Sequence, residues 1–217
     1  MRSATQITVT TFGIIMGLAG LEHGLGEILQ GNATPPGIMF PSWPNSAFFS
    51  TLAGEPAMSI IPNFLVTGIL ACLISLIYLM WATRFVTRKH TGLALIFLAV
   101  IMLLVGGGIF PPVIGIFIGV LATRIDTSSI EGHTQATVGL RSFLSKAWSL
   151  SFIGCVIGWL LLFPGVNILG YFFGVDDPNL MVGLLAFALG LLLLTIATGL
   201  IRDRLGATRS SQVSMVA

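Results

Sequence analysis

Long uninterrupted apolar stretches constrain this chain more than any other feature. A helix needs about 20 apolar residues, within a range of roughly 17 to 25, to cross the hydrocarbon core of a bilayer. Four stretches meet this length: Ile7–Leu29, Ile60–Ala82, Ala147–Leu169 and Leu180–Ile201. Because backbone groups in hydrocarbon must find hydrogen-bond partners within the protein, such stretches fold as helices. The pattern predicts an all-α, polytopic transmembrane helix bundle.

The composition excludes most other classes of protein. Only 8% of the residues are charged, whereas soluble domains carry about 25%, so a water-soluble fold of this size lacks a polar surface. Two cysteines cannot form a disulfide scaffold for 217 residues. The chain has no CxxC, HExxH, GxSxG or Walker-type motif. We therefore expect the lipid bilayer as a partner, no nucleic acid, and no cofactor that a motif would require.

A fifth apolar region, residues 91–123, is too long for one ordinary helix and slightly short for two. Glycines and prolines interrupt its middle. Glycine propagates a helix poorly, and proline has no backbone donor. We predict a hairpin of spans 91–106 and 109–123, formed either by two short crossing helices or by a re-entrant pair. The residues of this break are Gly106, Gly107, Gly108, Pro111 and Pro112.

The positions of the basic residues favour the hairpin over a single long crossing. With a hairpin, all ten Lys and Arg residues fall on one side of the membrane, whereas a single crossing would divide them. Basic residues in short loops mark the cytoplasmic side. We therefore predict about six crossings in the plasma (cytoplasmic) membrane, with both termini cytoplasmic.

This topology divides the chain, which we expect to form one domain over residues 1–217, into spans and connections. The longest connections are an outer loop at 30–59 and a cytoplasmic loop at 124–146. Residues 202–217 form a short polar tail, which we expect to be disordered. The predicted spans are 7–29, 60–82, 91–106, 109–123, 147–169 and 180–201.

The first span carries a stripe of glycines. At about 100° per residue, these glycines fall within an arc of about 60°, which forms a smooth face for close helix packing. We expect this span to be a central helix of the bundle. Alternatively, the glycine face contacts another chain, in a homo-oligomer or in a larger membrane complex. The glycines expected to pack are Gly13, Gly17, Gly20 and Gly24.

Glu22, His23 and Glu27 are the ionisable residues inside a confident span, and we expect them to carry the function. An ionised group near the bilayer centre costs about 2.5–3.5 kcal/mol on insertion scales, so such groups default to a functional role. His23 and Glu27 are four residues apart and share one helix face, where they could relay protons or bind a divalent metal. A structural pair that fixes the helix rotation is the alternative.

The predicted outer side carries further carboxylates without any Lys or Arg. Glu55 lies in the loop at 30–59, and Asp176 and Asp177 lie between the last two spans. Such a face attracts protons and cations. The outer loop is also rich in proline and aromatic residues, which is typical of an interfacial belt and would also suit a semi-rigid lid over Glu27.

These features favour a small permease or a proton- or cation-coupled carrier with Glu22, His23 and Glu27 as its ionisable centre. Two other functions fit the same residues. One is a membrane-embedded enzyme that acts on a lipid-like substrate, with His23 and Glu27 as acid and base. The other is a non-catalytic subunit that packs against a larger membrane complex through its glycine faces.

Overall fold

A computed structural model describes residues 3–125, 137–175 and 177–216, with side chains up to residue 205. The chain forms two compact units. The first contains residues 1–8, 124–166 and 176–217, and the second contains residues 9–123 and 167–175. The second unit contains the three ionisable residues of the first span, the outer loop and the helix break.

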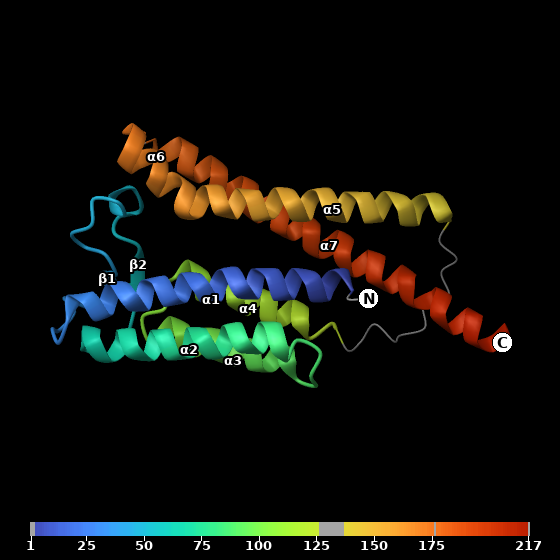
Figure 1. The fold of residues 1–217 in the computed structure, drawn as a ribbon, viewed down its shortest axis with the longest axis horizontal. Coiled ribbons are helices and arrows are strands. Elements are labelled where there is room, and N and C mark those ends of the chain that lie inside the picture. Colours follow the sequence, from blue (N-terminus) through green and yellow to red (C-terminus); the bar gives the residue numbers. More distant parts are fainter. Residues whose placement is uncertain (1–2, 126–136, 176, 217) are drawn as a thin grey trace. The chain divides into compact units, whose positions relative to one another are not determined.

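Apart from two short strands, the described elements are helical (Figure 1). The α-helices are α1 (Ala4–Gln30), α2 (Phe64–Arg84), α3 (Thr91–Leu104), α4 (Phe110–Ala122), α5 (Val138–Leu160), α6 (Val166–Phe173) and α7 (Pro178–Val216). The other elements are β1 (Met39–Pro41), β2 (Pro56–Met58), the 3₁₀ turn η1 (Ser50–Leu52) and the π-helical turn η3 (Leu161–Gly165).

The largely helical fold is confirmed, and four described helical segments are long and apolar enough to cross a membrane, which supports the predicted membrane class. They are Ala4–Gln30, Phe64–Arg84, Val138–Phe173 and Pro178–Leu205. The third is not regular throughout, because η3 interrupts it around Pro164. Proline removes a helical hydrogen bond and crowds the preceding turn, so the helix distorts there.

Two predicted non-helical segments are wrong in part. Helix α5 begins at Val138, inside the predicted loop 124–146, and the Thr137 side chain accepts a hydrogen bond from Leu140 N at its start. Helix α7 continues to Val216, through the tail that we expected to be disordered. Hydropathy marks where a helix can enter the membrane, but a helix itself continues until a breaker or cap ends it.

The region 91–123 forms two short antiparallel helices. Helices α3 and α4 contain 14 and 13 residues. Gly92 at the start of α3 lies against Gly119 near the end of α4, and Ala99 lies against Gly115. Pro111 and Pro112 stand in the first turn of α4, where a missing N–H costs no helical hydrogen bond. The three glycines therefore make the break, and the two prolines begin the second helix.

The glycine stripe of α1 lies against α2 (Figure 1). Each of its four glycines approaches a neighbouring side chain so closely that an added Cβ would overlap it. Gly13 faces Ala82, Gly17 faces Leu79, Gly20 faces Ser75 and Gly24 faces Cys72. Absence of side chains lets the two backbones approach, as in other small-residue interfaces of membrane helices.

The loop after α1 folds against the break between α3 and α4. Strands β1 and β2 pair antiparallel, with Phe40 opposite Ala57, and both residues pack on Phe64 at the start of α2. At the end of β2, Met58 O accepts a hydrogen bond from Gly106 N at 2.9 Å, and two residues later Ile60 N donates to Leu104 O at 3.0 Å. These bonds hold the end of α3 and the glycine break beside the loop.

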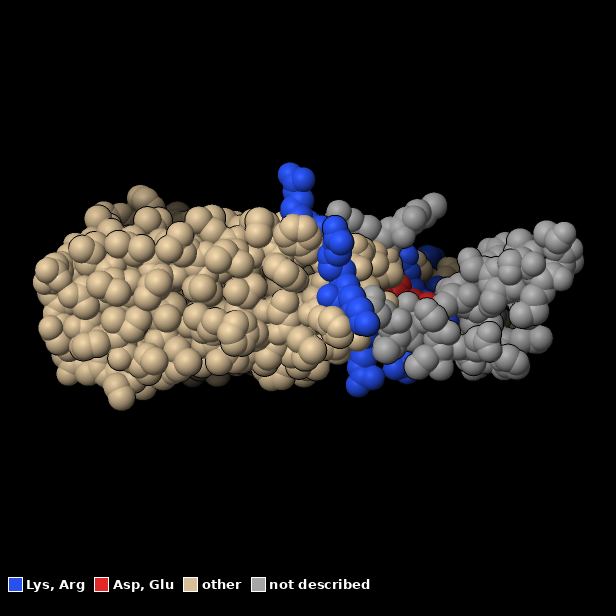
Figure 2. Space-filling view, turned by 90° about the horizontal axis from the view of Figure 1, so that it is seen from below, with Lys and Arg blue, Asp and Glu red and all other residues tan. Residues whose placement is uncertain are grey.

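The surface of α2 and α3 is apolar outside one band. Figure 2 shows Lys and Arg side chains gathered in that band and a broad surface without visible charge on one side of it. Val66, Leu73 and Met80 of α2 and Phe97 of α3 are among the exposed large hydrophobic residues. An apolar face of this kind suits contact with lipid.

In the other unit, α5 and α7 pack together through small residues. Gly158 lies against Ala188, and Cys155 Sγ donates to the Ala188 carbonyl oxygen at 3.5 Å. The carboxylate of Asp203 on α7 accepts hydrogen bonds from the backbone N–H groups of Ala4 and Thr5, at 2.9 and 2.8 Å. An acid at this position satisfies free donors of the α1 N-terminus and complements its dipole.

Candidate functional site

His23 is the centre of a buried polar cluster. Its side chain is on α1, and the residue is only 3% exposed. His23 Nδ1 shares a hydrogen bond of 3.0 Å with Ser42 Oγ, which directly follows β1. On the other side of the ring, His23 Nε2 lies 3.7 Å from Glu55 Oε2, so the two form an ion pair when the imidazole is protonated. The ring orientation is therefore set by the loop as well as by α1.

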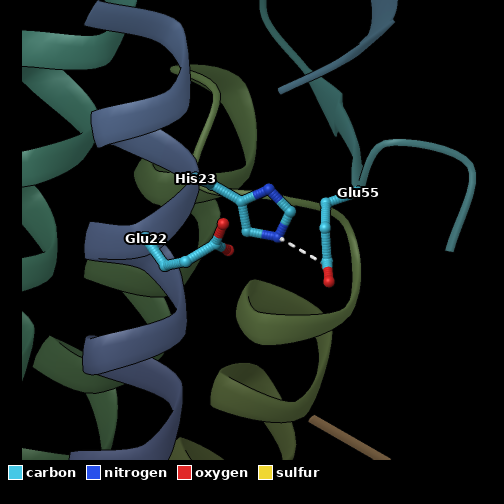
Figure 3. A group of neighbouring side chains, drawn as sticks. All are labelled: Glu22, His23 and Glu55. Atoms are coloured by element: carbon cyan, nitrogen blue, oxygen red, sulfur yellow. Dashed lines mark ion pairs between the residues drawn. The ribbon is translucent and has the colours of Figure 1, made fainter. Parts of the chain in front are cut away.

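Glu22 completes a group of three ligand-type side chains. One oxygen or nitrogen from each of Glu22, His23 and Glu55 lies within 4.8 Å of the others. Figure 3 shows the Glu22 and His23 side chains leaving α1 and Glu55 approaching the imidazole from the loop. The Trp43 indole lies beside Glu22, but neither Trp43 Nε1 nor Glu22 Oε1 has a hydrogen-bond partner among the described residues.

The backbone before β2 is contorted in a way that brings Glu55 into the cluster. Ala53, Gly54 and Glu55 all have positive φ, at 54°, 74° and 58°. A left-handed conformation costs an L-residue roughly 1–2 kcal/mol, so two of these three residues are strained. Strain of this kind persists only where surrounding contacts hold it, and it gathers at functional sites. Here Trp43 N donates to Gly54 O at 2.9 Å and holds the turn.

The Glu55 carboxyl is buried although it belongs to a loop. The residue is 4% exposed, and Asn167 Nδ2 of α6 donates to Glu55 Oε1 at 3.2 Å. Burial raises the pKa of Glu55 to about 7, and the hydrogen bond from Asn167 opposes that rise. Glu55 therefore changes its charge near neutral pH, beside an imidazole and a second carboxyl group.

The glycine break of α3–α4 leaves room for the ionisable side chains of α1. A Cβ at Gly108 would overlap the His23 ring, and a Cβ at Gly106 would overlap the Glu27 carboxyl group. Both glycines also have positive φ, at 83° and 95°, which L-residues rarely adopt. Gly107 faces Met102 instead. The break thus brings backbone directly against two functional candidates.

Glu27 lies one helical turn from His23 and in a different environment. It is 0% exposed, and neither of its carboxyl oxygens has a hydrogen-bond partner among the described residues. The Thr67 hydroxyl lies beside it, but Thr67 Oγ1 donates to Val105 O or Ser59 Oγ, at 2.5 and 2.7 Å. A fully buried acid without a partner is costly in this setting, and such groups require explanation.

The structure groups the ionisable residues differently from the prediction made from helical spacing, which paired His23 with Glu27. His23 contacts Ser42 and Glu55, and no hydrogen bond joins it to Glu27 in the described part of the chain. Glu22, which lies away from the glycine stripe, joins the cluster instead. The cluster around His23 therefore contains Glu55 in place of Glu27, because a loop residue can approach a helical side chain that its neighbour four residues away does not contact.

The residues of the predicted outer acidic face belong to different units of the chain, with Glu55 in the second and Asp177 in the first. Glu55 is buried, whereas Asp177 is exposed and its Oδ1 accepts from Asn179 N at 2.9 Å near the start of α7. Asp176 lies outside the described residues. The carboxyl group of the loop, Glu55, therefore lies beside the imidazole of His23 and not at the surface.

Ser42 and Asn167 also belong to the cluster, although neither was predicted from the sequence. Ser42 is 1% exposed, and its carbonyl accepts a hydrogen bond of 3.0 Å from Gln30 Nε2 at the end of α1. Asn167 is also 1% exposed. A lone amide inside the apolar stretch 147–169 was a usable signal, because buried polar side chains in membrane helices seek partners. Ser42, in a loop rich in small polar residues, had no comparable signal.

The arrangement permits two kinds of chemistry. An imidazole with carboxyl groups on one side and a hydroxyl on the other can pass protons between them. The same nitrogen and oxygen atoms can bind a divalent cation. Glu27, a turn away and without a hydrogen-bond partner among the described residues, can hold a proton or a cation at the glycine break.

No protein-family model, curated protein or solved structure matches this chain significantly.

Proposed function

We propose that the protein is a small proton- or cation-coupled membrane carrier in which Glu27 is the ion-carrying group. The observation that supports this most directly is a carboxyl group that is 0% exposed and has no hydrogen-bond partner among the described residues. A charged carboxylate there would lose its hydration without compensation. Glu27 must therefore hold a proton or a bound cation, and exchange of that ion is the elementary step of a coupled carrier.

The broken pair α3–α4 supports the same proposal. Many carriers bind their coupling ion where a helix is interrupted near the membrane interior, since free backbone groups there replace water. Gly106 lies directly against the Glu27 carboxyl group, and the Thr67 hydroxyl, which donates to the Val105 carbonyl, adds an oxygen atom beside it. Glu27 of α1 thus lies against the glycine turn of the α3–α4 hairpin.

The length of the pair favours a re-entrant hairpin. Fourteen residues of α3 rise about 21 Å, less than the hydrocarbon thickness of about 30 Å. The start of α3 and the end of α4 are next to basic residues, Arg88 and Arg124. Basic residues in short loops favour the cytoplasmic side of the plasma membrane for these two ends. In this topology the glycine break turns inside the outer half of the membrane, at the level of Glu27, and both termini are cytoplasmic.

Proton uptake by proteoliposomes tests the proposal. Purified protein is reconstituted with a pH-sensitive dye inside, and an inward proton gradient is applied with the membrane potential clamped. We expect uptake well above empty liposomes, with at least a tenfold loss in Glu27→Gln. Asp177→Asn, which removes an exposed carboxylate, is the matched control and should keep the wild-type rate. Equal rates in Glu27→Gln and wild type would contradict the proposal, and so would the absence of uptake above empty liposomes with both a proton gradient and a sodium gradient.

A membrane-embedded enzyme is the second candidate, and one observation favours it. Ser42, His23 and Glu55 form a line of hydroxyl, imidazole and carboxyl, with distances of 3.0 and 3.7 Å. Serine hydrolases use these three groups. However, Ser42 is 1% exposed, and its N–H donates to Glu55 O, so no substrate reaches the hydroxyl in this arrangement. Labelling of Ser42 by a fluorophosphonate, lost in His23→Ala, would move the assignment to the enzyme.

A non-catalytic subunit of a larger complex is the third candidate. Its four α1 glycines are already covered by α2, so they leave no smooth stripe on that face for a second protein. Purification at native expression level separates this function from the carrier, because a subunit would co-purify with partners in stoichiometric amounts.

A further inference from the structure

We propose that Glu22, His23 and Glu55 form a binding site for a divalent transition-metal ion, of the class represented by Zn²⁺. This site is separate from the Glu27 carboxyl group, and the proposal does not depend on the carrier function. It rests on the distances between the three side chains, on the hydrogen bonds that orient two of them, and on the negative charge of two buried carboxylates.

The distance between His23 and Glu55 is close to what an ion would bridge, and Glu22 lies near enough to complete the set after a small side-chain movement. Zn²⁺ binds imidazole nitrogen and carboxylate oxygen at about 2.0–2.2 Å, so two ligand atoms of one ion are about 3.4 Å apart in a tetrahedral site. The three candidate atoms lie within 4.8 Å of one another, and His23 Nε2 and Glu55 Oε2 are 3.7 Å apart. That separation is too long for a hydrogen bond but suits an ion between the two atoms.

Two of the three ligands are oriented by polar groups on their far side. Ser42 Oγ bonds His23 Nδ1, so a proton on Nδ1 leaves the Nε2 lone pair directed at the two carboxyl groups. Asn167 Nδ2 bonds Glu55 Oε1 and leaves Oε2 toward the imidazole. Metal-binding histidines and carboxylates in proteins are held in this way, and the holding groups tune affinity by about 10–100-fold.

The buried charge also favours a divalent ion. Two ionised carboxylates in one cluster repel each other, and a neutral imidazole does not compensate them. Gly24, the residue after His23 on α1, packs on Cys72 of α2. The nearest basic residue along α2 is Arg84, twelve residues after Cys72, which corresponds to a rise of about 18 Å along the helix. A divalent cation would neutralise both carboxylates. One imidazole and two carboxylates are a mixed nitrogen and oxygen set, which favours Zn²⁺ and similar ions over Mg²⁺ or Ca²⁺.

Titration of chelator-treated protein in detergent with ZnCl₂ tests the proposal by calorimetry. We expect one ion per chain, with affinity at least tenfold weaker in His23→Gln and in Glu55→Gln. Asn167→Ala, which removes only the holding group, should weaken binding by about tenfold. Asp177→Asn, which removes an exposed carboxylate, is the matched control for Glu55→Gln and should bind as the wild type does. Circular dichroism and gel filtration of each variant verify its fold.

Cobalt substitution gives a readout that does not depend on affinity. Co²⁺ in a site of low symmetry develops visible absorption bands, and we expect them in wild type and Glu27→Gln but not in His23→Gln. Cys72→Ser addresses the alternative ligand, since thiolate also binds Zn²⁺. Absence of saturable binding at one ion per chain would overturn the proposal. So would binding that survives His23→Gln and Glu55→Gln but is lost in Cys72→Ser.

The outcome is independent of the carrier test. Glu27→Gln is expected to abolish proton uptake and keep the metal, whereas Glu55→Gln is expected to lose the metal whether or not protons move. Failure of the metal titration therefore leaves the carrier proposal standing, and failure of proton uptake leaves the metal site standing.

Discussion

Replacing Gly106 by alanine tests the close approach between the helix break and Glu27. Gly106 has φ of 95°, and a left-handed conformation costs an L-residue roughly 1–2 kcal/mol. The new Cβ would also overlap both oxygens and the carboxyl carbon of Glu27. Overpacking in a buried site typically costs 1–3 kcal/mol. The two effects together predict a loss of about 2–5 kcal/mol in the free energy of unfolding.

A second substitution separates these two costs. In a Glu27→Ala background the carboxyl group is gone, so Gly106→Ala should cost only the backbone strain of roughly 1–2 kcal/mol. The double-mutant cycle should therefore give an interaction energy of about 1–3 kcal/mol between the two positions. No coupling is expected if Glu27 points elsewhere.

Equilibrium unfolding in mixed micelles, driven by sodium dodecyl sulfate and followed by circular dichroism, measures these free energies. Gly190→Ala is the matched control, because Gly190 is exposed on α7 and an added Cβ would meet nothing within 4 Å. It should be neutral or stabilising by about 0.5–1 kcal/mol. The reasoning is refuted if Gly106→Ala is no more destabilising than Gly190→Ala, or if its cost is the same with and without Glu27.

Three further predictions concern single contacts. Relative to Glu55→Gln, the free energy of unfolding of the metal-free protein should fall by roughly 3 kcal/mol as pH rises from about 4.5 through 7, because the raised pKa of Glu55 keeps it protonated in the folded state. The neighbouring Glu22 and His23 are present in both proteins, so a difference that stays constant across that pH range would contradict the assignment. Gly24→Val should destabilise the protein by about 1–3 kcal/mol, because the new Cβ would lie 2.7 Å from Cys72 Sγ. Gly183→Val is the control, since a Cβ there would meet nothing within 4 Å, and equal unfolding midpoints for the two variants would exclude close α1–α2 packing. Asp203→Ala should cost about 1 kcal/mol and speed hydrogen exchange at the N–H groups of Ala4 and Thr5, and unchanged exchange there would show that the carboxylate does not cap α1.

Much of the helical architecture could be predicted from local pattern. The first stretch, 7–29, lies within α1 (Ala4–Gln30), and 91–106 and 109–123 correspond to α3 and α4. Apolar length and helix breakers are local properties, so a single sequence reports them. The same locality explains the errors at 138–146 and 202–216, where the helix continues beyond the apolar residues that signalled it.

The membership of the cluster could be predicted only in part. Glu22 and His23 were found because ionisable residues are rare inside apolar spans. Glu55 was placed at an outer surface, since neither its left-handed backbone nor its burial is visible in the residue order. Ser42 reaches His23 from nineteen positions away, and Asn167 reaches Glu55 from 112 positions away.

The residue order of this protein therefore determined that it is a set of membrane-length helices, that α1 carries a smooth glycine face, and that acidic groups and an imidazole lie within its apolar length. Those conclusions follow from helix periodicity and from the cost of placing charge in hydrocarbon, both of which act over a few residues. Tertiary structure alone decided that Glu55 faces His23 and that Glu27 faces Gly106 with no hydrogen-bond partner in the described part of the chain. Such contacts depend on how a loop and a broken helix return to α1, and they are stabilised jointly by groups far apart in the chain.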